Sequence, residues 1–169
     1  MKRSVALCFL VSACAAPTPH TVAIPFNPSE VAWFSTPGNN TIHGSAVMRT
    51  VGGEVRTCAG LDANLVPNSS YARARFQEMY QSLDRGLLRA DSGFKFADTD
   101  PNYAHASRTV TCDPQGYFTF TNLPDGDYFV TAKIVWGVPM RYFTSWQGGY
   151  LMQRISVQGG ETKDIVLSE

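Results

Sequence analysis

The sequence has no excess of charge of either sign, because its 14 Lys and Arg residues balance its 14 Asp and Glu residues. With the charge balanced, nothing in the composition indicates a basic face for nucleic acid or a polybasic patch for anionic membranes. Charged residues make up only 17% of the chain, whereas aromatic residues reach 12%. With its many glycines and prolines, this composition is typical of an exported β-protein rather than a helical cytosolic protein. We expect no nucleic-acid partner.

The apolar run near the start of the chain is too short to cross a hydrocarbon core about 30 Å thick. This run, residues 5–11, follows Lys2 and Arg3 and is followed by Ser12 and Ala13. A basic start, a short apolar stretch and small residues at a cleavage position are the three parts of an export signal. The sequence therefore predicts a signal peptide rather than a permanent transmembrane helix.

The end of this signal, Val11-Ser12-Ala13-Cys14, resembles the lipobox of bacterial lipoproteins. The resemblance implies that residues 1–13 are removed and that Cys14 is lipidated, with several acyl chains, since one chain anchors a protein only weakly. Ala15 after the cysteine implies sorting to the outer membrane, and thus a lipid-anchored protein on its periplasmic face in the bacterial cell envelope. The alternative is a plain signal peptide cut near Ala13 or Ala16.

The mature chain divides into a tether and one domain. Residues 14–30 contain four prolines and show no helical or strand period, which predicts a proline-rich tether between the lipid and the domain. Residues 31–169 are of single-domain size and long enough for a hydrophobic core.

Once the signal and the lipid account for Cys8 and Cys14, the remaining cysteines are Cys58 and Cys112. An even pair in an oxidising compartment predicts a disulfide, which would stabilise the fold by about 4 kcal/mol in the chain-entropy model. A metal or redox pair is the alternative, but the sequence has no CxxC spacing and no neighbouring histidine.

From Val31 onward, short strand-like runs alternate with Gly, Pro and Asn turns, which predicts an all-β fold: an antiparallel sandwich of about seven strands. Residues 140–146 and 150–157 are expected to be separate strands. The exception is about residues 69–87, where apolar side chains recur at helical spacing and predict one inserted α-helix packed on a sheet: Phe76, Met79, Tyr80, Leu83 and Leu87. The polar residues 89–107 are expected to form a long surface loop.

The run Asp113-Pro114-Gln115-Gly116-Tyr117-Phe118-Thr119-Phe120, followed by Leu123-Pro124-Asp125-Gly126-Asp127-Tyr128, resembles the carboxypeptidase regulatory-like domain, a transthyretin-like (prealbumin-like) β-sandwich. The resemblance implies a hairpin at Gly116, a second turn at Pro124 and Gly126, and Phe118 and Phe120 in the core. It also implies an accessory module without catalytic residues. Fold alone does not assign an activity.

Transthyretin-related hydroxyisourate hydrolases provide the enzyme alternative, but their C-terminal Tyr-Arg-Gly-Ser is missing here. The three histidines, His20, His43 and His105, have no catalytic context, and there is no Gly-x-Ser-x-Gly elbow. We therefore expect no enzymatic activity, no catalytic residues and no cofactor.

Two candidate sites remain. Asp98, Asp100 and Asn102 offer oxygen ligands at alternate positions, but no closing Glu follows, so a solvated loop and no metal are expected. A set of aromatic side chains could stack on a sugar or could be ordinary core and hairpin pairs: Trp136, Tyr142, Phe143, Trp146 and Tyr150. The sequence thus predicts a binding or assembly module with an envelope protein partner, or alternatively a carbohydrate- or peptidoglycan-binding accessory domain.

Overall fold

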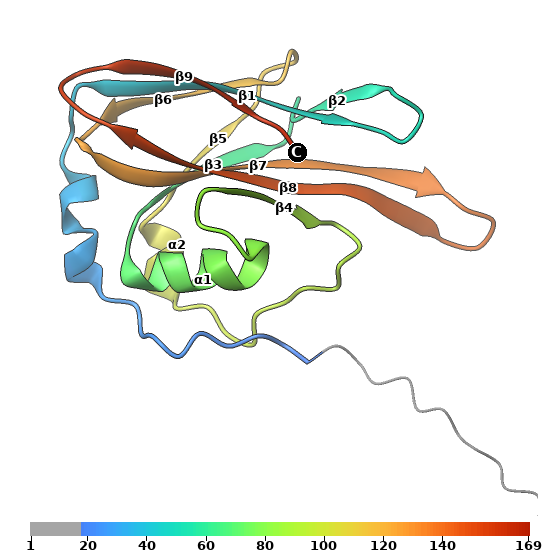
Figure 1. Ribbon diagram of the computed structural model, residues 1–169, viewed down its shortest axis with the longest axis horizontal. Coiled ribbons are helices and arrows are strands. Elements are labelled where there is room, and N and C mark those ends of the chain that lie inside the picture. The colour runs from blue at the N-terminus through green and yellow to red at the C-terminus, as the bar shows by residue number, and fades with distance from the viewer. Residues whose placement is uncertain (1–17) are drawn as a thin grey trace, which may run out of the picture.

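The computed structural model describes residues 18–169 and shows two β-sheets packed face to face (Figure 1). In the four-stranded sheet, β1 (Asn40–Arg49) pairs with β2 (Val55–Thr57), β6 (Tyr117–Leu123) and β9 (Thr162–Leu167). The five-stranded sheet has the order β4 (Arg85–Arg89), β8 (Thr144–Val157), β7 (Gly126–Pro139), β3 (Asp62–Pro67) and β5 (Arg108–Thr111). The predicted all-β, two-sheet class is confirmed, with nine strands in the described chain in place of about seven.

The core lies between the sheets, because each strand turns alternate side chains inward. Ile42 of β1, Phe118 and Phe120 of β6, and Tyr128 and Val130 of β7 are all buried there. The rings of Phe118 and Phe120 meet edge to face, with centroids 5.7 Å apart. The expectation that Phe118 and Phe120 lie in the core is confirmed.

The turns around β6 do not form the hairpin that the family resemblance implies. Gly116, at φ +88°, donates its N–H to the carbonyl of Asp113 and closes the first turn as expected. However, β5 pairs with β3 in one sheet, and β6 pairs with β1 in the other. Each turn therefore carries the chain across the sandwich, because Tyr117–Leu123 lies in the four-stranded sheet and its neighbours in sequence lie in the five-stranded one.

A second apolar cluster covers the outer face of the five-stranded sheet, where α1 (Ser70–Tyr80) packs. Phe76 of α1 stacks on Phe129 of β7 with centroids 4.3 Å apart. The predicted helix of about residues 69–87 is correct for its first part and wrong for its last. The helix ends because Gln81 adopts the left-handed conformation, and residues 85–89 then form β4. Gly86 lets this strand pass beneath Tyr80, since a Cβ there would lie 2.8 Å from the Tyr80 Cβ.

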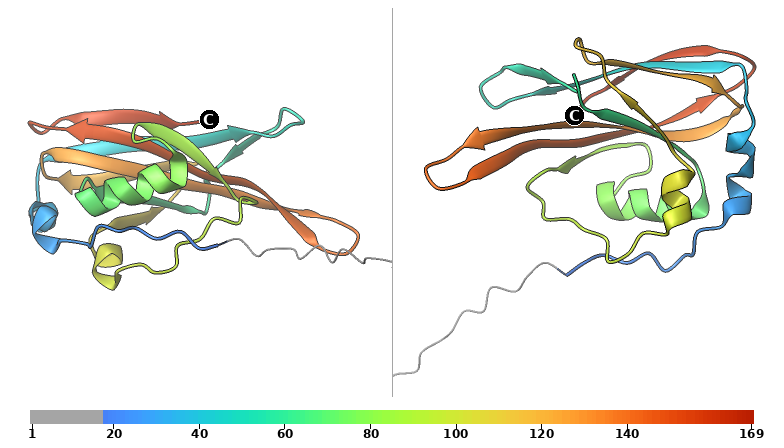
Figure 2. Two further views of the ribbon diagram at one scale, coloured as in Figure 1. Left: turned by 60° about the horizontal axis from the view of Figure 1, so that its bottom comes forward. Right: turned by 180° about the vertical axis from the view of Figure 1, so that it is seen from behind.

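The longest element is the hairpin of β7 and β8, which projects beyond the rest of both sheets (Figures 1 and 2). Residues 140–146 and 150–157 were expected to be separate strands, but 144–157 is continuous as β8. The break expected at Gly148 and Gly149 is absent because both glycines pair across the hairpin, with Val135 and Ile134.

The start of the described chain lies along the domain and ends in two short 3₁₀ helices, η1 (Pro28–Glu30) and η2 (Ala32–Ser35). His20 pairs with Glu78 of α1, and Phe26 meets Tyr71 edge to face at 5.7 Å, so the later part of the predicted tether contacts the domain. The loop expected at 89–107 contains a short helix, α2 (Pro101–His105). Within residues 18–169, no helix is both long and apolar enough to span a bilayer.

Candidate functional site

A cleft of about 420 Å³ lies between the two sheets. One wall comes from β2 and the residues that follow it, and the other comes from β7. The lining combines apolar, hydroxyl and guanidinium groups: Val55, Arg56, Thr57, Ala59, Leu61, Ile134, Val135 and Trp136. A concave site whose apolar lining is combined with a few polar groups is the usual form of a ligand site, and in this cleft the polar share is about as large as the apolar one.

Trp136 is the aromatic side chain of this cleft. Alternate residues of β7 face the interior, and Ile134 is fully buried there. Trp136 continues the same row and lies partly buried at the edge of the core. Gly148 supports the ring from β8, because a Cβ at Gly148 would lie only 2.5 Å from Cζ3 of Trp136. The strand pair thus holds the indole at the opening between the sheets.

Arg56 reaches Trp136 from the opposite sheet. It pairs with Met48, which is buried in the core, so Arg56 also lies on the inward side of its strand. Its guanidinium carbon is 5.8 Å from the Trp136 ring centroid, and its Nη2 donates a hydrogen bond of 2.9 Å to Glu54. Hydrogen-bond donors that are themselves paired with a carboxylate therefore stand beside an aromatic ring, an arrangement that can bind a ligand with both apolar faces and hydroxyl groups.

The structure brings the four predicted stacking residues to one hairpin but not to one surface. Trp136 faces the other sheet. Trp146 pairs with Gly137, and Tyr150 pairs with Lys133, so both lie on the outer side. Tyr142 is 83% exposed in the turn. Only Trp136 of these four lines the cleft, so the four side chains do not form one stacking surface.

The disulfide predicted between Cys58 and Cys112 is confirmed, with the two sulfurs 2.07 Å apart. Cys58 follows β2 in one sheet, and Cys112 follows β5 in the other. Because Cys58 lies two residues after Arg56, the bond fixes one wall of the cleft against the opposite sheet.

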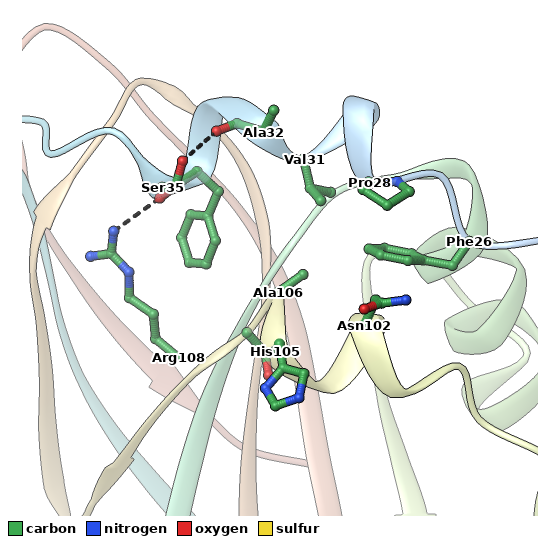
Figure 3. Close-up of a pocket in the computed structure, with 11 residues that line it drawn as sticks. Phe26, Pro28, Val31, Ala32, Ser35, Asn102, His105, Ala106 and Arg108 are labelled. Carbon is green, nitrogen blue, oxygen red and sulfur yellow. Dashed lines mark hydrogen bonds between the residues drawn. The ribbon is translucent and has the colours of Figure 1, made fainter.

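A second pocket, of about 460 Å³, lies between the two 3₁₀ helices and the α2–β5 connection (Figure 3). It is lined mainly by Phe26, Val31 and Phe34, with His105 and Arg108 at its side. The Arg108 guanidinium already donates to the carbonyls of Phe34, Thr121 and Asn122. This arginine stabilises the fold, and the lining of this pocket is more apolar than that of the Trp136 cleft.

The three histidines lie in separate surroundings. His20 Nδ1 is 2.6 Å from Glu78, whereas His43 Nδ1 is 3.6 Å from Asp164 between two exposed side chains. His105 lies in the last turn of α2. None of the three lines the Trp136 cleft.

The candidate calcium residues have structural partners. The Asp100 carboxylate accepts the Asn102 N–H at 2.8 Å and caps α2, and the Asp98 carbonyl accepts from Arg75. In the part of the chain that the structure describes, no three His, Cys, Asp or Glu side chains gather as a metal site.

Sequence reasoning identified Trp136 but missed Arg56. No local signal marks that arginine, since its role depends on a contact across the two sheets. Arg56 lies in the short strand β2, and nothing in the sequence indicates that this strand approaches residue 136.

No protein-family model and no curated protein matches the chain in sequence. In structure, the chain is similar to a "putative carbohydrate binding protein" from Pseudomonas aeruginosa, with a TM-score of 0.71. The likeness covers 85% of this chain and 97% of that chain, at 24% sequence identity. At this identity it shows that the two proteins share a fold.

Proposed function

We propose that the protein is a non-enzymatic binding module that holds a glycan in the Trp136 cleft. The observation that carries the proposal is the position of the Trp136 ring, which stands at an opening between the sheets with the Arg56 guanidinium 5.8 Å from its centroid.

The chemistry of a sugar matches these two groups. A pyranose has an apolar C–H face that packs on an indole, while its hydroxyls need donors and acceptors around the rim. Arg56 and Glu54 offer both, with side chains 44% and 62% exposed. A purely apolar ligand would leave this ion pair without a role.

The shared fold supports the same choice, because the similar structure from Pseudomonas aeruginosa is described as a "putative carbohydrate binding protein". The sequence predicted either an assembly module with a protein partner or a carbohydrate accessory, and the cleft favours the second. With a lipid anchor at Cys14 on the periplasmic face of the outer membrane, peptidoglycan is the glycan that we propose as ligand.

Titration calorimetry of the full chain with soluble peptidoglycan fragments tests this function. Trp136→Ala should weaken binding at least tenfold, because it removes the stacking face. Trp146→Ala is the matched control, since it removes an indole from the outer side of the same hairpin and should leave affinity unchanged. Equal binding by the wild type and Trp136→Ala, or a crosslinked stoichiometric protein partner with no glycan retention, would contradict the proposal.

A further inference from the structure

The end of the β7–β8 hairpin has no neighbouring strand. β3 pairs with residues 128–132 of β7, and β4 pairs with residues 149–153 of β8. Beyond these positions, the two strands pair only with each other as far as Pro139 and Thr144. At about 3.3 Å per residue, this ribbon extends the sheet by roughly 20 Å. The outer end of the ribbon, around the turn between β7 and β8, stands clear of the rest of the domain in all views (Figures 1 and 2).

The tip of this ribbon, residues 140–146, is apolar and aromatic. Its large side chains are exposed: Met140 by 52%, Tyr142 by 83%, Phe143 by 65% and Trp146 by 57%. Arg141 is the one charged residue between 134 and 149, and its guanidinium carbon is 5.2 Å from the Tyr142 ring centroid. A soluble domain gains nothing from four such side chains exposed together, so the tip has the composition of a contact surface.

We propose that this tip inserts into the interfacial layer of a lipid bilayer. Trp and Tyr prefer the level of the headgroups, where the ring is in an apolar layer and its polar atom meets water. Phe143 and Met140 supply purely apolar surface below that level, and Arg141 can meet lipid phosphates. An interfacial element of this kind reaches about 5–10 Å into the bilayer.

The hairpin cannot go deeper. The outward N–H and C=O groups of an isolated ribbon have no partners in hydrocarbon, where each unsatisfied group costs several kcal/mol. Thr144 and Ser145, next to the aromatic turn, add further polar groups. The tip therefore lies at the surface of the bilayer, and the rest of the domain stays in water.

The course of the chain agrees with this orientation. From η1 the described chain runs under α1 toward the end of the molecule where the hairpin projects (Figures 1 and 2). Its first described residue is Thr18, and the predicted lipidated residue, Cys14, precedes it by four residues. Four residues span at most about 14 Å. With Cys14 lipidated, the bilayer would lie within this distance of Thr18, and the tip would give the protein a second point of contact with it.

Brominated phospholipids test the insertion, because bromine quenches indole emission only on contact. The full chain is mixed with phosphatidylcholine–phosphatidylglycerol vesicles as two single-tryptophan variants. Trp33→Phe/Trp136→Phe keeps Trp146 at the tip, and Trp136→Phe/Trp146→Phe keeps Trp33, which packs on Tyr128 at the other end of the sandwich with centroids 5.4 Å apart.

We expect Trp146 to be quenched, more strongly by bromine near the headgroup end of the acyl chain than by bromine near its methyl end. Trp33 should not be quenched. Adding Tyr142→Ser/Phe143→Ser to the Trp146 variant should reduce its quenching to the level of Trp33, whereas Tyr117→Ser/Val166→Ser, at exposed positions of the four-stranded sheet, should not.

Vesicle-bound protein with unquenched Trp146 would overturn the proposal. The proposal would also be overturned if, without lipid, Trp146 became less accessible to a soluble quencher as the protein concentration rises. The tip would then contact a second copy of the chain. Neither result depends on the Trp136 cleft, so failure here leaves the proposed glycan function intact.

Discussion

The guanidinium carbon of Arg56 lies 5.8 Å from the ring centroid of Trp136, although the two residues belong to different sheets. The contact closes one side of the cleft, and Glu54 orients the guanidinium by accepting from its Nη2. The polar part of the proposed sugar site therefore comes from the four-stranded sheet, and its aromatic part comes from the five-stranded sheet.

Replacing Arg56 should weaken glycan binding while leaving the free energy of unfolding almost unchanged. Arg56→Ala should weaken glycan binding about tenfold or more, since a hydrogen bond from a charged group contributes about 1.5–3 kcal/mol. Its free energy of unfolding should change little, because exposed ion pairs contribute about 0–1 kcal/mol. Calorimetry and urea unfolding measure both quantities. Arg89→Ala, which breaks the exposed ion pair between Arg89 of β4 and Asp91, is the control and should change neither the affinity nor the stability strongly. A loss of stability without a loss of affinity would make Arg56 a brace between the sheets.

Removing the disulfide should affect both properties. The double variant Cys58→Ser/Cys112→Ser opens a loop with a sequence separation of 54 and should lose about 2–5 kcal/mol of unfolding free energy. It should also bind glycan more weakly, because the wall that carries Arg56 is released from the opposite sheet. Urea unfolding of the oxidised and reduced wild type checks the first effect. If reduction leaves the midpoint unchanged, the bond does not constrain the fold.

Two kinds of feature of this fold could be predicted from the sequence. One depends on a local pattern of residues, and the other depends on a residue type that leaves only one possible pair. The alternation of Phe118 and Phe120 placed both in the core, and the cysteine count left one possible disulfide. The end of α1 could not be predicted, because Leu83 and Leu87 keep the helical spacing while Gln81 leaves the helix. Leu87 instead packs against the core between the sheets.

The site was half predicted for a related reason. The sequence shows aromatic residues at positions 136, 142, 146 and 150. The side of the sheet on which each side chain lies, however, depends on the register of β7 against β8. That register places Trp136 opposite Gln147 and Trp146 opposite Gly137, on opposite sides of the ribbon. The approach of Arg56 depends on how the two sheets pack, which no local pattern specifies.

Acid should loosen the junction between η1 and α1. The Glu30 carboxylate accepts from the Ser70 N–H and from the Ser70 hydroxyl, both at 2.7 Å, and these hydrogen bonds lower the pKa of Glu30. Because the pKa is lower in the folded state, this stabilisation is present above the ordinary glutamate pKa of about 4.3 and is lost as pH falls through the folded value. The protection factors of the amides of residues 70–73, each corrected for the intrinsic exchange rate at the same pH, should therefore fall as the pH drops through the lowered pKa of Glu30. Glu30→Ala should show reduced protection of these amides already at neutral pH. Unchanged protection in that variant would mean that Glu30 does not stabilise this junction.

Gly148→Ala should disturb the Trp136 cleft and should destabilise the fold by more than the strain of its left-handed backbone alone. Gly148 has φ +82°, and a Cβ there would lie 2.1 Å from the Ile134 carbonyl and 2.5 Å from the Trp136 ring. Gly159 has φ +67°, and a Cβ at that position would meet nothing within 4 Å, so Gly159→Ala carries the cost of the left-handed conformation alone, about 1–2 kcal/mol. Gly148→Ala should lose more stability than this control, shift the Trp136 emission and weaken glycan binding, because the indole has to leave its support on β8. Urea unfolding, fluorescence and calorimetry of the two variants make the comparison. Equal losses of stability with equal affinities would mean that the indole does not depend on Gly148, and the ring would then need another support to hold a sugar.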